Sequence, residues 1–386
     1  MKYMGSKRQM LNNGLGNLIR AKASDAKRVV DLFCGSAAVT WYAAENTNRP
    51  VLAVDLQHFS AVLAQSVISR TKAVNPAVFA RKWLTDARHT QWKSEICYDA
   101  FALEHSLLDI ENFGIQAKEL CLRSTKPITN AYGGFYYGPM QALALDALRE
   151  HLPIEEPQRS ICLATLISAA SKCAAAPGHT AQPLSPSKTS EKSIRDAWRK
   201  DPFVLVYTEL VDICKRAANR IGQTMVANAL DIASTLNRHD LVFVDPPYSG
   251  VQYSRFYHVL ETVTLWKPVQ VSGTGRYPPF DQRPQSDFSN KGGSVKALRD
   301  LLEGLAESRA TVLFTFPNTE CSNGLSGQIV RDTAEKFFNV KSKLIFGRFS
   351  TLGGNNFLRK SRLKSEELIL TLTPKSRALT RRNRPV

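Results

Sequence analysis

Long apolar segments are missing from this sequence. None of its hydrophobic runs approaches the roughly 20 residues that a membrane-spanning helix needs. The opening stretch, MKYMGSKRQML, is basic but has no apolar segment after it, so we do not expect a secretion signal. The hydrophobic share of 43% is ordinary for a globular chain. We therefore expect a globular protein in the cytoplasm, without a membrane partner.

Paired cysteines are also missing. The seven cysteines occur singly, and no CxxC motif brings two of them together. Disulfide frameworks and zinc sites usually need such pairs, so we expect neither, and no bound metal. An odd, unpaired set of thiols is typical of a reducing compartment.

Acidic residues are scarce relative to basic ones. Lys and Arg number 51 against 34 Asp and Glu, which gives a formal net charge of +17. The final segment, 376–386, is a basic tail, but most of the excess lies in the body of the chain. Cationic surfaces gain affinity for nucleic acids because neutralising phosphates releases counterions. The charge therefore favours a nucleic-acid partner, with an ordinary basic soluble protein as the alternative.

Short β-branched runs recur along the chain. They are 27–33, 50–56, 240–246, 310–316, 343–347 and 367–373. The runs are continuously apolar, which is typical of strands buried on both faces of a parallel sheet. Helical patterns follow several of them, so we predict an α/β fold with a doubly wound, Rossmann-like sheet. The last two strands lie close together in sequence, which favours an antiparallel finish.

Residues 86–225 differ in pattern from the segments on either side. Helical periodicity dominates them, with Pro139 at one predicted helix start and Pro177-Gly178 at another helix end. We predict a mainly helical insertion between the second and third strands. The expected division is a sheet domain of 1–85 and 226–375, an inserted domain of 86–225, and the tail 376–386.

Two phosphate-binding motifs are absent. Without GxGxxG a dinucleotide is disfavoured, and without GxxxxGK[ST] a nucleoside triphosphatase is disfavoured. In DLFCGSAAV, Gly35 permits a tight strand-to-helix turn, and Asp55 ends the next strand, where an acid can accept hydrogen bonds from two ribose hydroxyls. An adenosine compound without phosphates fits, and S-adenosylmethionine is the obvious cofactor. The alternative is an ordinary turn.

The N-terminal stretch KYMGSK precedes a predicted helix. It brings together Tyr3, Gly5, Ser6 and Lys7. A glycine beside a serine and a lysine can wrap a bound carboxylate. The alternative is an ordinary helix entry with Ser6 as its cap.

The strand 241–244 runs into Asp245, Pro246, Pro247 and Tyr248. Prolines have no N–H, so the backbone offers only carbonyl acceptors beside a carboxylate and an aromatic ring. This set suits a planar group with an NH2, such as adenine. Hydrogen bonds to Asp245 and the Pro246 carbonyl would draw the amine nitrogen toward tetrahedral geometry and free its lone pair to attack a sulfonium methyl group. The alternative is an ordinary loop.

The order KYMGSK, DLFCGSA, AVD, an insertion, DIAST and DPPY resembles the Dam-like, alpha-group adenine-specific DNA methyltransferases. Asp245, Pro246, Pro247 and Tyr248 match the catalytic motif of that family residue for residue. The cofactor contacts that the resemblance implies are Tyr3, Lys7, Asp31, Phe33, Gly35, Ser36, Asp55, Asp231 and Ile232. It covers 1–85 and 226–375, whereas 86–225 matches loosely, as target-recognition regions of that family diverge.

One departure from the family pattern concerns its glycine motif. The usual FxGxG reads Phe33-Cys34-Gly35-Ser36-Ala37, with alanine at the second glycine. We expect the added methyl group to narrow the approach to the cofactor slightly and to alter its affinity without abolishing binding.

An enzyme that modifies an adenine amine in a duplex must flip the base out. We expect Tyr248 to stack on that base. Phe256 and Tyr257 either join it or simply pack at a helix start. The predicted DNA contacts are Lys172, His179, Gln182, Tyr253, Arg255, Arg359 and Arg362.

Together these features predict a site-specific adenine methyltransferase that acts on double-stranded DNA, as in restriction-modification systems. The alternatives are an RNA adenine methyltransferase and a DNA-binding relative without activity. The recognition sequence, a companion restriction enzyme, and the choice between monomer and dimer are left open by the sequence.

Overall fold

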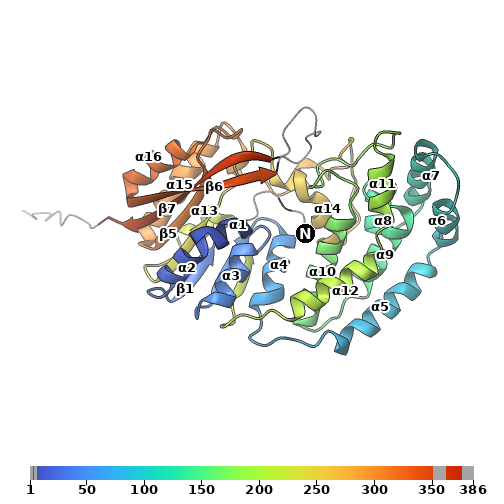
Figure 1. Cartoon of the computed structure of the whole chain (residues 1–386), viewed down its shortest axis with the longest axis horizontal. Coiled ribbons are helices and arrows are strands. Elements are labelled where there is room, and N and C mark those ends of the chain that lie inside the picture. The colour runs from blue at the N-terminus through green and yellow to red at the C-terminus, as the bar shows by residue number, and fades with distance from the viewer. Residues whose placement is uncertain (1–2, 4–6, 351–361, 376–386) are drawn as a thin grey trace, which may run out of the picture.

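A computed structural model of the chain describes residues 3, 7–350 and 362–375. A sheet flanked by helices forms one half, and a helical block forms the other (Figure 1). The strands are β1 Arg28–Asp31, β2 Val51–Asp55, β3 Gln223–Val226, β4 Asp240–Val244, β5 Thr311–Pro317, β6 Phe338–Ser350 and β7 Arg362–Pro374. The helices of the sheet half are α1 Arg8–Met10, η1 Leu11–Leu15, α2 Gly16–Ala23, α3 Ala38–Asn46, α4 His58–Ile68, α13 Ala229–Ala233, α14 Tyr253–Leu265, η2 Phe280–Gln282, η3 Asp287–Ser289, α15 Ser294–Ser308 and α16 Gly327–Phe337. The helical block contains α5 Ala77–Trp92, α6 Cys97–Glu104, α7 Ile110–Leu122, α8 Pro127–Tyr132, α9 Pro139–Glu150, α10 Gln158–Cys173, α11 Glu191–Trp198 and α12 Pro202–Cys214.

The seven strands form one mixed sheet in the order β3-β2-β1-β4-β5-β7-β6. The first five are parallel, and β7 runs antiparallel to both β5 and β6. The doubly wound α/β fold and its antiparallel finish are therefore confirmed. From β1 the chain moves outward to β2 and β3, and later from β4 outward to β5. The switch point between β1 and β4 is where open α/β sheets bind ligands, at the carboxyl ends of the strands.

Both faces of the sheet are covered, as the apolar runs predicted. On β4, Leu241 and Phe243 join one hydrophobic cluster, and Val242 and Val244 join another. The first cluster includes α2, α3, α4, α14 and the helical block, and the second includes α13, α15 and α16. Successive side chains of a strand point to opposite faces, so a strand buried on both faces reads as a continuous apolar run.

One strand was missed from the sequence. The edge strand β3 pairs in parallel with β2, with Thr224 opposite Ala53, and it precedes the strand that ends at Asp245. Its side chains are largely exposed. An exposed edge strand lacks the buried apolar run by which the others were identified. The insertion was predicted between the second strand and a third strand at 240–246. In the structure the helical block lies between β2 and β3, and the predicted third strand is β4.

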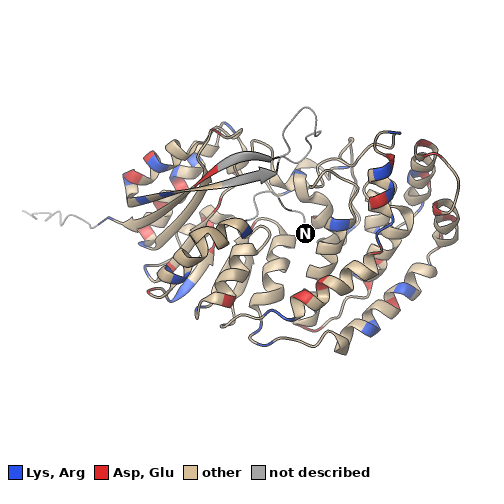
Figure 2. Ribbon diagram, viewed as in Figure 1, with Lys and Arg blue, Asp and Glu red and all other residues tan. Residues whose placement is uncertain are grey.

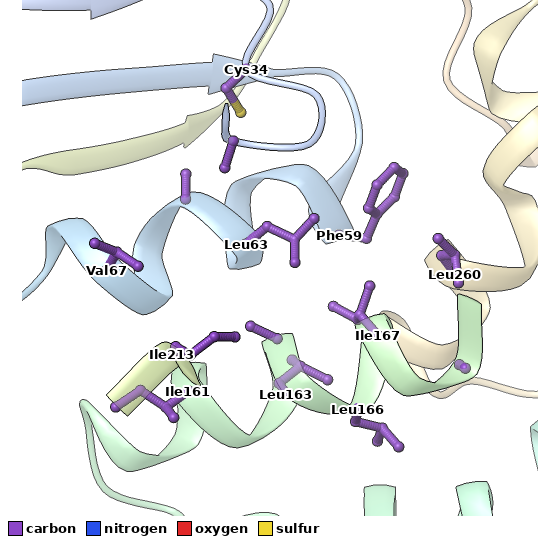
Figure 3. Close-up of a cluster of buried hydrophobic side chains, with 14 of the residues drawn as sticks. Cys34, Phe59, Leu63, Val67, Ile161, Leu163, Leu166, Ile167, Ile213 and Leu260 are labelled. Carbon is purple, nitrogen blue, oxygen red and sulfur yellow. The ribbon is translucent and has the colours of Figure 1, made fainter. Parts of the chain in front are cut away.

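The helical block packs directly on the sheet half through α10. In Figure 3, Leu163 and Ile167 of α10 face Phe59 and Leu63 of α4, with Leu260 of α14 beside them. All of these side chains belong to one hydrophobic cluster. None of the described helices is long and apolar enough to cross a bilayer.

Candidate active site

One cavity lies at the carboxyl ends of the strands beside the switch point. Its volume is about 930 Å³, open mouth included. The glycine turn after β1 and the loop after β4 both line it, so two motifs far apart in sequence share one hollow. The predicted residues that line it are Tyr3, Lys7, Asp31, Phe33, Gly35, Ser36, Asp55, Asp245, Pro246, Pro247, Tyr248 and Tyr253. In the described part of the chain, no group of three or more His, Cys, Asp and Glu side chains is arranged to hold a metal.

The glycine turn is built around Gly35 and Asp55. The φ of Gly35 is +47°, and a Cβ there would lie 2.5 Å from the Tyr3 hydroxyl, so only glycine fits without strain. Asp55 accepts hydrogen bonds from the backbone N–H of Gly35 at 2.8 Å and of Gln57 at 3.0 Å. Burial raises the pKa of Asp55 to about 6. Asp55, which was predicted to hold a ribose, is therefore hydrogen-bonded to the backbone of the glycine turn.

Asp31, the last residue of β1, has one oxygen without a partner. Its Oδ2 accepts a hydrogen bond from Thr40 Oγ1 at 2.7 Å, whereas Oδ1 is buried and has no partner among the described residues. Burial raises the pKa of Asp31 to about 7. Gln57 Oε1 and Ser254 Oγ, from two other residues of the cavity wall, are likewise buried without a recorded partner in this part of the chain. Buried polar atoms normally have hydrogen-bond partners, so these three atoms indicate a polar ligand.

Asp245 is held by groups from two distant segments, and a third segment supplies a second partner of Lys7. Lys7 Nζ lies 3.0 Å from Asp245 Oδ1 and 3.1 Å from Glu367 Oε2, and Thr315 Oγ1 donates to Asp245 Oδ1 at 2.8 Å. Burial raises the pKa of Asp245, and the charge of Lys7 opposes that rise. Burial alone would lower the pKa of Lys7, but the two carboxylates raise it, so the ammonium stays charged. All recorded bonds of this carboxylate within the described ranges go to Oδ1, which leaves Oδ2 for another donor.

Asn323, which belongs to no motif, holds the loop after β4. Asn323 is fully buried, and its Nδ2 donates to the Pro247 carbonyl and to the Phe288 carbonyl, each at 3.0 Å. No described group is recorded as a donor to the Pro246 carbonyl. Tyr248 contacts Tyr253 edge to face, with 6.4 Å between the ring centroids. The loop thus presents a carboxylate oxygen, a carbonyl and an aromatic ring to the same cavity.

Aromatic residues after the loop divide into two groups. Tyr253 lines the cavity, whereas Tyr257 is buried and stacks on Tyr3 with 4.6 Å between the ring centroids. Phe256 is half-buried against His179. Of the two roles considered for Tyr257, packing at a helix start is the one observed.

Several residues expected at the cofactor lie elsewhere. Asp231 is exposed on α13, and Ile232 is buried in the second hydrophobic cluster. Neither lines the cavity, whereas Asn228, just after β3, does. The unrecognised end of β3 is why Asn228, three residues before Asp231, was not singled out from the sequence. Gly5 and Ser6 lie outside the described residues.

Ala37 does not narrow the cavity as expected. Its side chain is fully buried in the first hydrophobic cluster and does not reach the cavity wall. Its φ is +60°, a left-handed conformation that costs an alanine about 1–2 kcal/mol. The departure from FxGxG therefore affects the backbone of the turn instead of the approach to the cofactor.

The predicted DNA contacts occupy different settings. Lys172 forms an ion pair with Glu209 between α10 and α12, and Gln182 is exposed in a loop. His179 lies in the same loop region, and Arg255 lies over the ring of Tyr277. Arg359 and the side chain of Arg362 lie outside the described residues.

A doubly wound sheet that ends in an antiparallel hairpin, with its cavity at the switch point, is typical of the Rossmann-like methyltransferase fold. The model of one protein family, the D12 class N6 adenine-specific DNA methyltransferases, matches residues 3–131 and 200–312. These segments are more than half of the chain, and the protein belongs to this family. The unmatched residues 132–199 lie in the helical block.

Three curated relatives are similar to the chain. Modification methylase LlaI of Lactococcus lactis subsp. lactis is 23% identical over 336 residues, which are 82% of this chain and 46% of the relative. Type II methyltransferase M.FokI of Planomicrobium okeanokoites is 24% identical over 287 residues, 72% of this chain and 39% of the relative. Modification methylase StsI of Streptococcus sanguinis is 34% identical over 67 residues, 17% of this chain and 10% of the relative. The chain spans less than half the length of these relatives.

Proposed function

We propose that this protein transfers a methyl group from S-adenosylmethionine to the exocyclic 6-amino group of an adenine flipped out of double-stranded DNA. Family membership supports the reaction class. The observation that carries the proposal is the position of Asp245, which shares one cavity with the Gly35 turn and has one oxygen to which no described residue is recorded as a donor.

The cavity wall fits S-adenosylmethionine by its unpaired polar atoms. Asp31 Oδ1 is a buried acceptor suited to the ammonium of the methionine part, and Asp55 beside Gly35 is suited to the ribose hydroxyls. The absence of a phosphate-binding glycine motif agrees with a cofactor that has no phosphate. When bound, S-adenosylmethionine supplies the electrophilic methyl group. The residues proposed to hold it are Tyr3, Lys7, Asp31, Phe33, Gly35, Ser36, Asp55 and Asn228.

The amine side of the cavity is assigned to the loop after β4. Asp245 Oδ2 and the Pro246 carbonyl would accept the two amine protons of adenine, which localises the lone pair on nitrogen. Tyr248 would stack on the base and fix its plane. Asn323 holds the Pro247 carbonyl and thereby the loop, so the two acceptors keep their spacing as the base enters.

Lys7 has a second role in this proposal. Asp245 is the stronger acceptor of an amine proton when it is ionised, and burial raises its pKa. The ammonium of Lys7, 3.0 Å away, favours the carboxylate form and orients it through Oδ1. Lys7 is therefore a positioning residue for Asp245 as well as part of the cofactor end.

The predicted insertion 86–225, most of which belongs to the helical block, is proposed as the target-recognition region. Its residues 132–199 lie between the two segments that match the family model, which supports a part that varies between relatives.

Methyl transfer can be tested with purified protein and S-adenosylmethionine that is tritiated on the methyl group. Duplex DNA should become labelled, and Asp245→Ala should abolish labelling. Asp300→Ala removes a carboxylate on α15 that pairs with Lys296 and is the matched control, which should label DNA like the wild type. Labelling of RNA in preference to DNA, or of the protein alone, would contradict the proposal.

A further inference from the structure

Four cationic side chains lie in pairs over two aromatic rings. Arg255 and Arg283 both lie over Tyr277, with 4.5 Å and 5.6 Å from each guanidinium carbon to the ring centroid. Arg276 and Lys118 both lie over Phe135, at 4.3 Å and 5.0 Å. Two cations on one ring repel each other, so each arrangement is stable only if something else offsets the repulsion.

Among the described residues, these four cations have no recorded acidic partner, whereas most other stacked cations do. Arg149, over Trp266, is also without one, but it donates to the Val263 and Thr264 carbonyls. Arg88 lies over Phe203 and pairs with Asp201, and Arg216 lies over Trp41 and pairs with Glu45. Among the described residues, no carboxylate forms an ion pair with Arg255, Arg283, Arg276 or Lys118. Figure 2 shows basic and acidic residues interspersed over the helices of the block, so an unpaired cluster is a local departure.

Hydrogen bonds separate the four cations into two groups. Arg276 donates from Nε to the Ala131 carbonyl at 2.9 Å and from Nη2 to the Asn130 carbonyl at 3.3 Å, so it fastens its loop to α8. Arg283 uses only Nε, which donates to the Pro278 carbonyl at 3.0 Å. Arg255 makes no recorded hydrogen bond through its side chain in the described part of the chain. The guanidinium edges of Arg255 and Arg283 are therefore left for an external acceptor.

Arg255 and Arg283 are each next in sequence to a residue of the cavity wall. Arg255 follows Ser254, and Arg283 precedes Pro284, and both of these neighbours line the cavity wall. Tyr277, between them, is fixed by its hydroxyl, which donates to the Ala181 carbonyl, and by its contact with buried His258. A fixed ring thus holds two cations, each adjacent in sequence to the cavity wall.

The charges of Arg255 and Arg283 favour the binding of an anion. Burial and the neighbouring charge of Arg255 both lower the pKa of Arg283, although the guanidinium stays protonated at any ordinary pH. Backbone phosphates, one bound by each guanidinium group, would offset this repulsion through bidentate, charge-assisted hydrogen bonds. A planar guanidinium held flat on a ring loses little rotational freedom when it binds such a group.

We propose that Arg255 and Arg283, mounted on Tyr277, form a clamp for backbone phosphates of the DNA strand that carries the flipped adenine. The proposal rests on the proposed function, because it takes the cavity to be the site that receives the base. It adds Arg283 and Tyr277 to the DNA-binding surface and gives Arg255 a specific role. Phosphate contacts next to the extruded nucleotide would hold the backbone in its rotated position while the base occupies the cavity.

The clamp can be tested by the salt dependence of DNA binding. Arg255→Gln/Arg283→Gln should reduce the slope of log affinity against log salt by ~1.8, because each lost phosphate contact contributes about 0.9. Affinity for S-adenosylmethionine, measured by calorimetry without DNA, should be unchanged and shows that the variant is folded. Arg88→Gln, which removes a stacked but acid-paired arginine, is the matched control and should keep the wild-type slope. Arg255→Lys/Arg283→Lys should retain most of the slope, because lysine keeps the charge, and lose affinity, because it cannot bind in a bidentate manner.

A second measurement locates the contact on the DNA. Once the methylated sequence is mapped, duplexes carry one neutral methylphosphonate at each position around the target adenine. A substitution adjacent to that adenine should weaken wild-type binding about 10-fold or more, the effect of losing charge-assisted hydrogen bonds, and should not weaken the double Gln variant further. Equal slopes for wild type and variant, or additive losses at every position, would overturn the clamp while DNA methylation by the wild type stands. Preferential binding of the clamp to RNA would overturn it as well. Absence of DNA methylation by the wild type would instead overturn the proposed function.

Discussion

Lys7 is buried between two carboxylates, with its Nζ 3.0 Å from Asp245 Oδ1 and 3.1 Å from Glu367 Oε2. These residues come from the N-terminal segment, the end of β4 and the final strand β7. The contact therefore ties both chain ends to the loop that is proposed to receive the amine. Removing one partner of a buried ion pair leaves an uncompensated charge, which is far more costly than the pair itself.

Replacing Lys7 should lower the free energy of unfolding and shift the pH dependence of kcat. In Lys7→Met, two like charges remain close together, and the pKa of Asp245, already raised by burial, should rise further. The carboxylate form is then lost at a higher pH, so the acidic limb of the kcat–pH profile should move upward. Urea unfolding should show a loss of about 3–5 kcal/mol. Adding Glu367→Gln to Lys7→Met should restore part of the lost stability and reverse part of the shift in the acidic limb. An acidic limb that does not move in Lys7→Met would contradict the role given to Lys7.

Asp31→Asn should stabilise the protein without its cofactor in a pH-dependent way. The pKa of Asp31 is raised from its ordinary value near 3.8 to about 7, so its stabilising contribution is complete below pH 3.8 and is lost as pH rises through 7. The variant should match the wild type near pH 4 and exceed it increasingly up to pH 7, by on the order of 2–4 kcal/mol. Affinity for S-adenosylmethionine should fall at the same time. Asp25→Asn, an exposed residue, is the control and should change neither quantity.

Gly35→Ala should disturb the turn in two separable ways. The φ of +47° costs an alanine about 1–2 kcal/mol, and the new Cβ would lie 2.5 Å from the Tyr3 hydroxyl. Cofactor affinity and melting temperature should both drop. Tyr3→Ala in the same chain should remove the clash and leave the backbone cost. Gly292→Ala, in an open position without a left-handed φ, should be nearly silent, and equal effects of the two glycine substitutions would refute the argument.

Ile167→Ala tests whether the helical block folds as a separate domain. Ile167 is fully buried in the hydrophobic cluster shared by α10 and the sheet half, so truncation should cost about 2–5 kcal/mol. Unfolding should remain a single transition in both wild type and variant. The exposed Val204 on α12 supplies the control, Val204→Ala, with little effect expected. Two resolved transitions would indicate that 86–225 folds as a domain separate from the one formed by 1–85 and 226–375.

The sequence predicted the elements whose burial leaves a clear pattern. The run that ends at Asp245 reads as a strand because both of its faces are covered. The edge strand β3 has exposed side chains, so it carried no such signal, and Asn228 at its end, which lines the cavity, was not singled out. Local pattern was sufficient where local burial decided the structure.

Contacts between distant segments could not be predicted in this way. Motifs indicated Lys7 and Asp245 separately, but nothing in their spacing indicated that they touch. Glu367 and Thr315 lie in strands that read as core, and their polar side chains were the only available sign of another role. Asn323 has no motif around it, and its function in holding the Pro247 carbonyl depends on tertiary packing alone.

The central claim is that the exocyclic amine of adenine is the methyl acceptor. It is tested most directly by incubating duplex DNA with the protein and S-adenosylmethionine, digesting the DNA to nucleosides and identifying the product by mass spectrometry. The account predicts N6-methyl-2′-deoxyadenosine as the product of the wild type and none from Asp245→Ala. Methylation of cytosine, or an equal yield of N6-methyl-2′-deoxyadenosine from Asp245→Ala, would contradict it.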